Sequence, residues 1–252
     1  MATFKTRLSK IAKTNGKVIL ANDYDYSIKN LETKTIQNIQ KLHPYLCGIK
    51  LNFHLLLPLG SKEILKINQT SHKYGLQTIA DIKLNDIGNT NRVTTEHLWN
   101  LGFDAVIVNP IMGLDSLKNL VKSAHKNEKG VITLCHMSAP EAKLSYDMEV
   151  KMEKKQQLYQ LFLNWALSAK VDGIIVGATF PKIIKYCSKK AGKNLNIFSP
   201  GVGTQGGSAN QVISSGTDYL IVGRTILNSK NPASTAKELQ LESFGKYHLG
   251  SC

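Results

Sequence analysis

Short apolar runs rich in β-branched residues recur along the chain, and polar residues or glycine follow each of them. Runs of about four to eight such residues are typical of buried strands. On this pattern we predict eight strands: Lys17–Asn22, Gly48–Asn52, Gln77–Lys83, Ala105–Pro110, Val131–Met137, Gly173–Ala178, Asn196–Val202 and Tyr219–Arg224.

Helical patterns fill the intervals between these runs. Apolar residues recur there at spacings of three and four, which places them on one face of a helix. Proline or glycine closes several of the patterns, as Pro44, Gly75 and Gly102 do. The predicted helices are Ile28–His43, Ser61–Tyr74, Thr90–Leu101, Leu114–His125, Lys151–Ala169 and Ile183–Lys190.

The alternation of strand and helix predicts the α/β class and a closed (β/α)8 barrel, known as a TIM barrel. No linker divides residues 1–252, so we predict a single domain whose C-terminal tail frays from about residue 242. A charged excursion, Glu141–Lys155, interrupts the spacing between the fifth and sixth strands. The alternative, a doubly wound open sheet, requires a glycine-rich turn after the first strand. Asp23-Tyr-Asp-Tyr26 stands there instead, which favours the barrel.

Charged residues stand where the third strand ends. Asp81 and Lys83 lie two residues apart and point to one face of an extended chain, and Asp86 follows at the start of a helix. Lys50 occupies the second strand. One interpretation is a set of buried ion pairs that stiffens the barrel mouth, although such pairs rarely stabilise a fold relative to apolar residues. The other is an array whose carboxylates keep Lys83 protonated, so that its ammonium stabilises a carbanion and then protonates it.

The ends of the seventh and eighth strands predict a phosphate site. The segment from Ser199 to Gly207 reads Ser-Pro-Gly-Val-Gly-Thr-Gln-Gly-Gly, and Gly223 and Arg224 end the eighth strand. Glycines let backbone N–H groups approach an anion, and arginine offers a fork of donors. An alternative is that the glycines serve turns alone. Their combination with arginine at the carboxyl ends of barrel strands favours a phosphorylated ligand.

Composition and charge narrow the classes of partner. The formal net charge is +14, from 32 lysines and arginines against 18 acidic residues, and the lysines are spread along the chain. This charge fits either a solvated lysine-rich surface or a field that attracts anionic substrates. The sequence contains neither a helix-turn-helix signature nor basic segments interleaved with aromatic residues, so we do not expect nucleic acid as a partner.

We expect no secretory signal, membrane span or metal site. The N-terminal segment lacks an apolar core, and no apolar run approaches about 20 residues. The four cysteines are irregularly spaced without a CxxC pair, which predicts a cytoplasmic location and no zinc site. His54, His97, His125 and His136 lack metal-ligand spacing, and we interpret them as packing or surface residues.

The segment Asp81-Ile-Lys83-Leu-Asn-Asp86-Ile87-Gly-Asn-Thr90 resembles the DxKxxDIxxT signature of the orotidine 5′-phosphate decarboxylase family. The resemblance extends in order along nearly the whole chain. The further matching positions are Asp23, Lys50, Ser138, Pro140, the Ser199–Gly207 segment and Val222-Gly223-Arg224. The resemblance implies a carboxy-lyase that converts orotidine 5′-monophosphate to uridine 5′-monophosphate, the last step of de novo pyrimidine synthesis. It also implies that no cofactor or metal is used, and that two copies form a homodimer with shared active sites.

The resemblance implies a role for each matching position. Lys50, Asp81, Lys83 and Asp86 would form a charged catalytic tetrad, with Lys83 as the proton donor to C6 of the pyrimidine. Asp86, Ile87 and Thr90 would reach into the neighbouring subunit's site. The implied substrate contacts are Asp23 and Lys50 to the ribose, Ser138 to the pyrimidine edge, Pro200 to the apolar side of the base, Gln205 to phosphate and base, and Gly223 and Arg224 to the phosphate.

Departures from the family pattern occur at two places, and two other functions remain open. Asn52 stands where the family often has glycine, and Glu141–Lys155 is more charged than usual. One is a magnesium-dependent sugar-phosphate decarboxylase or aldolase with a related barrel. Such enzymes are similar to this chain in the DxKxxD core, but they have a glutamate that binds the metal where this chain has Lys50. A catalytically silent barrel that binds a phosphorylated ligand or RNA would fit the net charge of +14. Intact charges at all four tetrad positions favour an enzyme.

Overall fold

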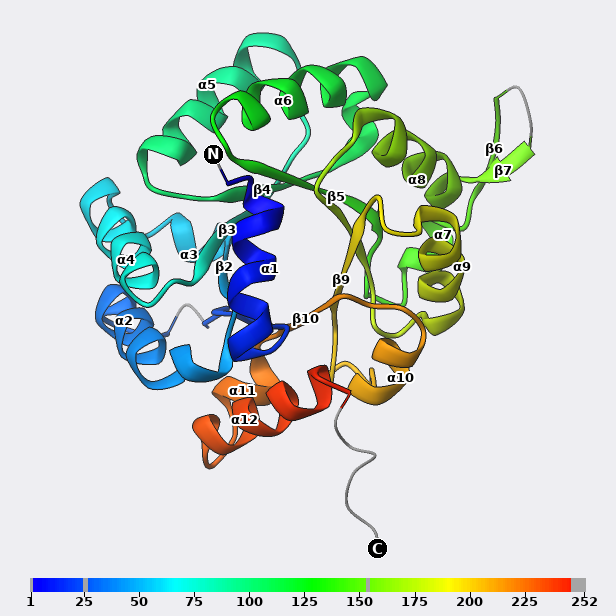
Figure 1. Ribbon diagram of the computed structural model, residues 1–252. Helices are drawn as coiled ribbons and strands as arrows, with labels where there is room; N and C mark the ends of the chain where they lie inside the picture. Colours follow the sequence, from blue (N-terminus) through cyan, green and yellow to red (C-terminus); the bar gives the residue numbers. More distant parts are fainter. Residues whose placement is uncertain (1, 25–26, 153–154, 246–252) are drawn as a thin grey trace, which may run out of the picture.

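The computed structural model describes residues 2–24, 27–152 and 155–245, and in it eight parallel strands close into a barrel. The strands pair in the order β1-β10-β9-β8-β5-β4-β3-β2, with helices around them (Figure 1). The prediction of a single (β/α)8 barrel is therefore confirmed. The barrel strands are β1 Val18–Ala21, β2 Gly48–Asn52, β3 Gln77–Leu84, β4 Ala105–Val108, β5 Gly130–His136, β8 Gly173–Val176, β9 Asn196–Pro200 and β10 Tyr219–Val222.

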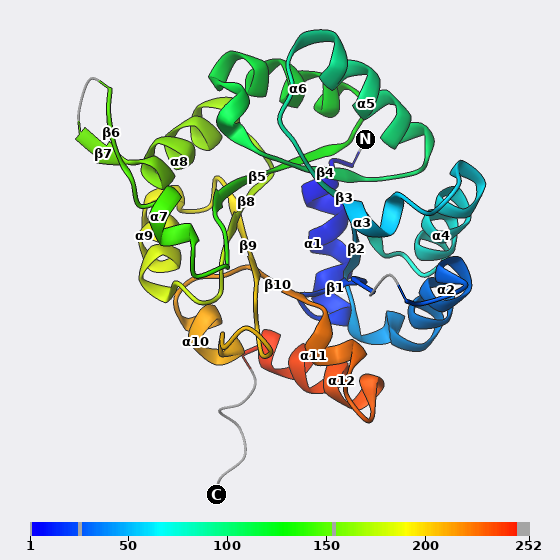
Figure 2. The ribbon, with the colours of Figure 1, turned by 180° about the vertical axis from the view of Figure 1, so that it is seen from behind.

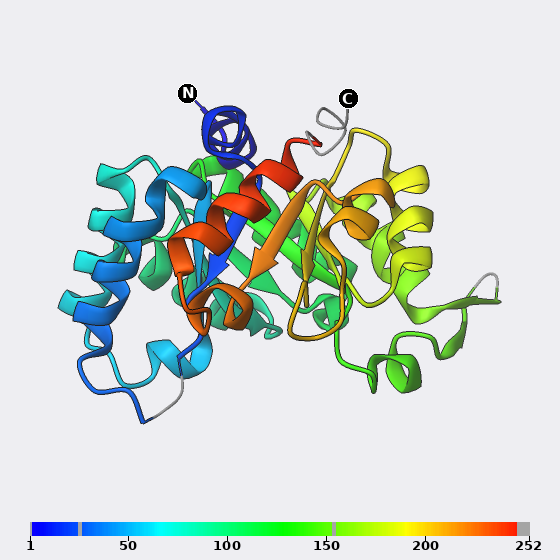
Figure 3. The ribbon, with the colours of Figure 1, turned by 90° about the horizontal axis from the view of Figure 1, so that it is seen from below.

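Helices form a ring outside the strands, which is seen from both ends of the barrel (Figures 1 and 2). One helix, α1, lies across one end of the barrel, whereas the short helices α3, α7 and α11 lie at the opposite end (Figure 3). The helices are α1 Phe4–Asn15, α2 Leu31–Leu42, α3 Phe53–Leu56, α4 Ser61–Lys73, α5 Gly88–Asn100, α6 Leu114–Lys126, α7 Ala142–Ser145, α8 Leu158–Ala169, α9 Pro181–Ala191, α10 Ala209–Ser214, α11 Arg224–Leu227 and α12 Pro232–Ser243.

Apolar side chains fill the barrel interior, as the inward-facing positions of a small barrel require. Ile19, Ile79 and Phe198 are fully buried there, in one cluster with Phe4 of α1. A Cβ added at Gly130 would lie 2.3 Å from the Phe4 ring, so glycine is needed where α1 meets β5. Because α1 closes this end, a ligand can enter the barrel only from the opposite end, where the strands terminate.

Asp104, which precedes β4, fastens α1 to the closed end of the barrel. Its carboxylate lies 3.2 Å from Arg7 Nη2 of α1 and 2.8 Å from His72 Nε2, and it accepts a 2.9 Å hydrogen bond from the Thr78 amide. Burial alone would raise the pKa of Asp104, but His72, the Thr78 amide and Lys129 outweigh burial and hold the pKa below its ordinary value of 3.8. The ionised carboxylate therefore stabilises the fold.

Asp104→Asn is expected to lower the free energy of unfolding by about 3 kcal/mol near neutral pH, since it leaves Arg7 and His72 without their buried anion. Because the folded-state pKa of Asp104 is depressed, the stabilisation is complete above the ordinary value of 3.8 and is lost as the pH falls through the depressed value. Denaturant unfolding of both proteins between neutral pH and acid should show the difference shrinking in acid. The exposed Asp115→Asn serves as the control, and an Asp104→Asn protein as stable as this control would contradict the assignment.

The excursion between β5 and α8 is where the sequence prediction of secondary structure is wrong. The helix predicted from Lys151 begins only at Leu158, because β6 Glu149–Lys151 and β7 Lys155–Gln157 precede it and pair as an antiparallel hairpin. This hairpin projects from the barrel wall (Figure 1). Each of these strands has three residues, and Val150 is the one apolar residue in them, so the sequence pattern does not distinguish them from the start of α8.

Smaller differences occur at the ends of the chain and of the second helix. The helix predicted from Ile28 begins at Leu31, and the sequence pattern did not predict α1 or α12. Fraying from about residue 242 stays a prediction, since α12 extends to Ser243 and residues 246–252 lie outside the described part of the chain. Among the described helices, none has the length and apolar character needed to cross a membrane.

Candidate active site

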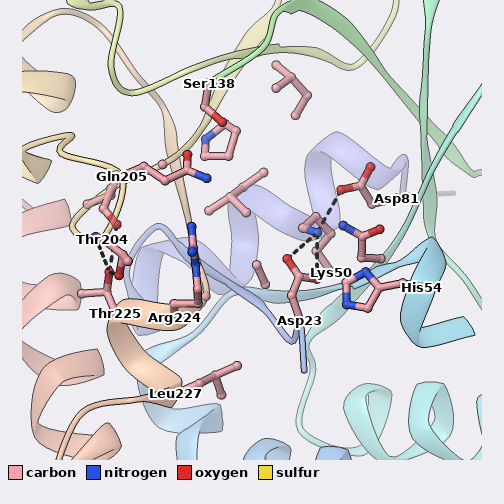
Figure 4. Close-up of a pocket in the computed structure, with 18 of the residues that line it drawn as sticks. Asp23, Lys50, His54, Asp81, Ser138, Thr204, Gln205, Arg224, Thr225 and Leu227 are labelled. Atoms are coloured by element: carbon pink, nitrogen blue, oxygen red, sulfur yellow. Dashed lines mark hydrogen bonds and ion pairs between the residues drawn. The ribbon is translucent and has the colours of Figure 1, made fainter. Parts of the chain in front are cut away.

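A pocket of about 720 Å³ opens at the carboxyl ends of the strands. Strand ends and the loops that follow them supply its walls, as Figure 4 shows for ten labelled side chains. Nine of the predicted site residues line it: Asp23, Lys50, Asp81, Lys83, Ser138, Pro200, Gln205, Gly223 and Arg224. Asp86, Ile87 and Thr90 do not line the pocket of their own chain.

Lys50 stands between two carboxylates at one side of the pocket (Figure 4). Its Nζ lies 2.9 Å from Asp81 Oδ2 and 3.2 Å from Asp23 Oδ1. Burial alone would lower the pKa of Lys50, but the attraction of Asp81 and Asp23 outweighs burial and raises the pKa. Lys50 is therefore a fixed cation with both neighbouring anions already paired to it.

Asp81 joins Lys50 to the second lysine of the array. Its Oδ1 accepts a 2.8 Å hydrogen bond from Lys83 Nζ, while its other oxygen faces Lys50. Burial alone would raise the pKa of Asp81, but the two ammonium groups outweigh burial and lower the pKa. The side chain of Lys83 is 37% exposed against 5% for Lys50, so the Lys83 ammonium is the one that opens into the pocket.

β3 is irregular at Lys83. Asp81 lies opposite Ile107 and Leu84 lies opposite Val108 of β4, so two residues of β3 bulge out of the pairing between these positions. Lys83 has a φ of +48°, in the left-handed region that residues with a Cβ seldom adopt. A bulge redirects the side chain that it carries. Here it brings the Lys83 ammonium back onto Asp81 at the mouth of the barrel.

The opposite side of the pocket is built from the glycine-rich loop after β9 and from Arg224 at the start of α11. Thr225 fastens the loop: its hydroxyl donates to the Val202 carbonyl over 3.0 Å and accepts from the Thr204 amide over 3.1 Å. Gly203, with a φ of +77°, packs so close that an added Cβ would lie 2.3 Å from the Thr225 hydroxyl. Arg224 and Gln205 face the space between the loop and the charged array (Figure 4).

Ser138 follows β5 and lies close to the same loop. The Thr179 hydroxyl donates a 2.9 Å hydrogen bond to the Ser138 carbonyl. Gly201 has a φ of +96°, and a Cβ there would lie 2.5 Å from Gln205 Oε1 and 3.1 Å from Ser138 Cβ. Ser138 and Gln205 therefore converge on one corner of the pocket, between the array and Arg224.

Asp86, Ile87 and Thr90 are exposed on the rim beyond β3. Asp86 Oδ1 accepts a 2.7 Å hydrogen bond from the Ile87 amide, and within the described residues Asp86 forms no ion pair. The Ile87 side chain is 63% exposed, and Phe53 and Ile111, which follow the adjacent strands β2 and β4, are 52% and 59% exposed. Large apolar side chains are thus exposed after each of the adjacent strands β2, β3 and β4, and Ile87 directly follows Asp86.

Several pocket residues were not predicted from the sequence. Tyr24, His54 and Thr225 line the pocket, and His54 Nε2 lies 3.1 Å from the Tyr24 carbonyl. Their positions just after strand ends were a usable signal, but hydroxyl and imidazole groups are too common along the sequence to stand out. Among the described residues, no group of three or more His, Cys, Asp and Glu side chains is arranged to hold a metal ion.

Comparisons with known proteins agree on one family. A family model described as "Orotidine 5'-phosphate decarboxylase / HUMPS family" matches residues 16–239. Orotidine 5′-phosphate decarboxylase of Pyrococcus abyssi is 33% identical over 231 residues, which cover 91% of this chain and 100% of that protein. The enzyme of the same name from Methanosarcina mazei is 35% identical over 217 residues, covering 84% and 91% of the two chains.

Solved structures agree with these sequence matches. The crystal structure of orotidine 5′-phosphate decarboxylase from Pyrococcus horikoshii superimposes with a TM-score of 0.74 at 31% identity, covering 90% of this chain and 99% of that one. A structure of the Methanocaldococcus jannaschii enzyme complexed with inhibitor BMP gives a TM-score of 0.74 at 29% identity, covering 90% and 97%.

Proposed function

The chain belongs to the orotidine 5′-phosphate decarboxylase / HUMPS family, and we propose that it decarboxylates orotidine 5′-monophosphate to uridine 5′-monophosphate, the last step of de novo pyrimidine synthesis. The observation that carries this proposal is the Asp23–Lys50–Asp81–Lys83 array facing Arg224 across one pocket. A nucleotide substrate needs both ends of such a site: a cation for its phosphate, and a charged array for its reacting carbon.

The proposed reaction needs electrostatic help at C6. When carbon dioxide leaves, the electron pair of the broken C–C bond stays on C6, where no neighbouring carbonyl delocalises it. The Lys83 ammonium, held 2.8 Å from Asp81, stabilises this carbanion and then transfers a proton from Nζ to C6. The neutral amine left behind regains a proton from solvent, which completes the cycle.

The remaining residues of the pocket are proposed to orient the nucleotide. Arg224 and the backbone at Gly223 would bind the phosphate, and Gln205 would link the phosphate to the base. Asp23 and Lys50 would hold the ribose hydroxyls. At the base, Ser138 would bind the polar edge and Pro200 would cover the apolar side. Binding of the phosphate, far from C6, would supply energy for positioning the reacting carbon.

A magnesium-dependent sugar-phosphate decarboxylase or aldolase is disfavoured by the residues themselves. The carboxylates of Asp23 and Asp81 converge on Lys50 Nζ at 3.2 and 2.9 Å, so a cation already occupies the place where they would hold a metal. A divalent ion beside the Lys50 ammonium would be repelled. Lys50 therefore favours the nucleotide enzyme over its metal-dependent relatives.

We also propose that two copies form a homodimer in which each contributes to the other's site. The exposure of Asp86, Ile87 and Thr90 supports this, because Asp86 forms no ion pair within the described residues and the apolar side chain of Ile87 faces solvent. Phe53 and Ile111 would extend the same interface. A cytoplasmic location is proposed as well, and the free thiols of Cys47, Cys135 and Cys187 support a reducing compartment.

The proposal predicts that the purified protein consumes orotidine 5′-monophosphate in buffer that contains EDTA, at the rate seen with added magnesium. The decrease in substrate absorbance follows the reaction, and chromatography identifies uridine 5′-monophosphate. A rate abolished by EDTA and restored by magnesium would favour the metal-dependent relatives. Tight, salt-sensitive binding of RNA without turnover of the nucleotide would indicate a binding protein instead.

A further inference from the structure

A ten-residue loop that carries Ser138 is closed at its base by two side chains. β5 ends at His136, the loop runs through residues 137–146 and includes α7, and Asp147 follows it. His136 Nε2 and Asp147 Oδ1 lie 3.3 Å apart, so the two ends of the loop meet. Neither atom has a hydrogen-bond partner within the described residues, and both are buried.

His136 and Asp147 attract each other only when the imidazole carries a second proton, and the hydrogen bonding of His136 shows why. His136 Nδ1 lies 2.9 Å from the Met137 carbonyl, and since a carbonyl only accepts, Nδ1 carries a proton. In the neutral ring, Nε2 then presents a lone pair to the Asp147 carboxylate. Attraction between the two ends of the loop therefore depends on a proton bound between Nε2 and Oδ1.

The surroundings of His136 are aromatic. The rings of Phe180, Tyr146 and Tyr159 lie 4.3, 5.4 and 6.0 Å away, so the titratable groups around the imidazole are the two tyrosines and Asp147. Burial lowers the pKa of His136, while the Met137 carbonyl and Asp147 raise it again in part. The negative charge of Asp147 thus favours a second proton on the imidazole, whereas burial among the aromatic rings opposes it.

Other contacts hold both sides of the loop, so the His136–Asp147 pair adjusts the loop rather than folds it. The carbonyl of Tyr146 accepts a 2.9 Å hydrogen bond from the Tyr159 amide, and that of Met148 accepts one of 2.9 Å from Leu158. At the other end, a Cβ at Gly177 would lie 2.4 Å from Ser138 Cα, so the backbone of Ser138 packs directly against the residue that follows β8. The pair connects these two anchored ends.

We propose that His136 and Asp147 form a proton-dependent clasp that closes loop 137–146 and positions Ser138 against the substrate base. The inference rests on the proposed function, in which Ser138 binds the pyrimidine edge. Both clasp residues are positioning residues, because they act on the base through Ser138. Opening of the clasp lets the loop relax away from the pocket and weakens base binding without changing the chemistry at Lys83.

The test compares the KM for orotidine 5′-monophosphate of the wild type, Asp147→Ala and Asp147→Asn between pH 5 and pH 8. The substrate phosphate also titrates near pH 6, so ratios of KM to the wild-type value are compared, in which this contribution cancels. For Asp147→Ala we expect a ratio of about five at pH 5 that approaches one at pH 8, with kcat unchanged. Glu141→Gln, which removes an exposed carboxylate from the same loop, should keep a ratio of one throughout.

Asp147→Asn gives the result that a merely structural role would not produce. The asparagine amide can donate to Nε2 of the neutral ring, so the clasp closes without the second proton, and the KM of this variant at pH 8 should be lower than the wild-type KM. KM ratios for Asp147→Ala that stay at one across the range, or that are equally raised at both pH values, would overturn the clasp. A wild type without turnover would instead contradict the proposed function.

Discussion

Lys83→Ala is expected to lower kcat/KM for decarboxylation by on the order of 10³-fold or more. Two contributions are lost together, because the Lys83 ammonium is both the more exposed cation of the charged array and the proposed proton donor. Lys50 cannot replace it, since its Nζ is paired at 2.9 and 3.2 Å with Asp81 and Asp23 and its side chain is only 5% exposed. Substrate binding should change less than turnover, because Arg224 and the loop after β9 remain.

Folding of the variant is checked separately, so that loss of activity is not mistaken for loss of structure. Asp81 keeps its pairing with Lys50 in Lys83→Ala, and thermal unfolding should therefore shift little. Lys62→Ala, on the surface of α4, removes a lysine of the same charge away from the pocket and should retain full activity. Turnover by Lys83→Ala within tenfold of the wild type would contradict the role of Lys83 as proton donor.

The strand ends made much of this pocket predictable from the sequence. Parallel strands in a closed barrel all terminate at one end, so residues as far apart as Lys50 and Arg224 must face the same opening. A charge at the end of an apolar strand, such as Asp81, is costly to bury unless it is paired. Its position after an apolar run therefore distinguishes it from an ordinary surface charge when only the sequence is known. Both features depend on local pattern and on topology, which the sequence contains.

The sequence predicts the contact between Asp81 and Lys83 from the alternation of side chains in a strand, but in the structure a bulge of β3 forms this contact. Simple alternation in a strand places Asp81 and Lys83 on the same face, but β3 departs from its pairing with β4 between Asp81 and Leu84. The left-handed backbone at Lys83, with a φ of +48°, is imposed by tertiary packing rather than by any preference of lysine. Backbone irregularities of this kind leave no residue signature unless glycine or asparagine occupies them.

The loop after β5 could not be predicted because its order comes from distant residues. Asp147 meets His136 only when α7 folds back, and Thr225 fastens the loop after β9 from the following strand end. Neither contact follows from spacing along the chain. His136 is accordingly interpreted from the sequence as a packing or surface residue. Its full burial fits packing, whereas its contact with Asp147 is seen only in the structure.

Mixing two inactive variants is expected to restore activity if subunits share their sites. In the proposed homodimer, Lys83 of one subunit works with Asp86 of the other. Lys83→Ala and Asp86→Asn should each be inactive as purified dimers. A mixed dimer contains one site with both substitutions and one site with neither, and random exchange makes half of the dimers mixed. Activity of the mixture should therefore rise to about a quarter of the wild-type value.

A second mixture separates shared sites from any general effect of subunit exchange. Lys83→Ala combined with Asp81→Asn leaves every site with a substitution, because Asp81 and Lys83 are 2.8 Å apart within one chain and belong to the same half of a site. This mixture should stay inactive at the same degree of exchange, which differently tagged subunits allow to be measured. Absence of recovery in the first mixture despite proven exchange would show that Asp86 acts within its own chain. That result would require the exposed segment after β3 to fold back onto the pocket, which Asp86 does not line in this structure.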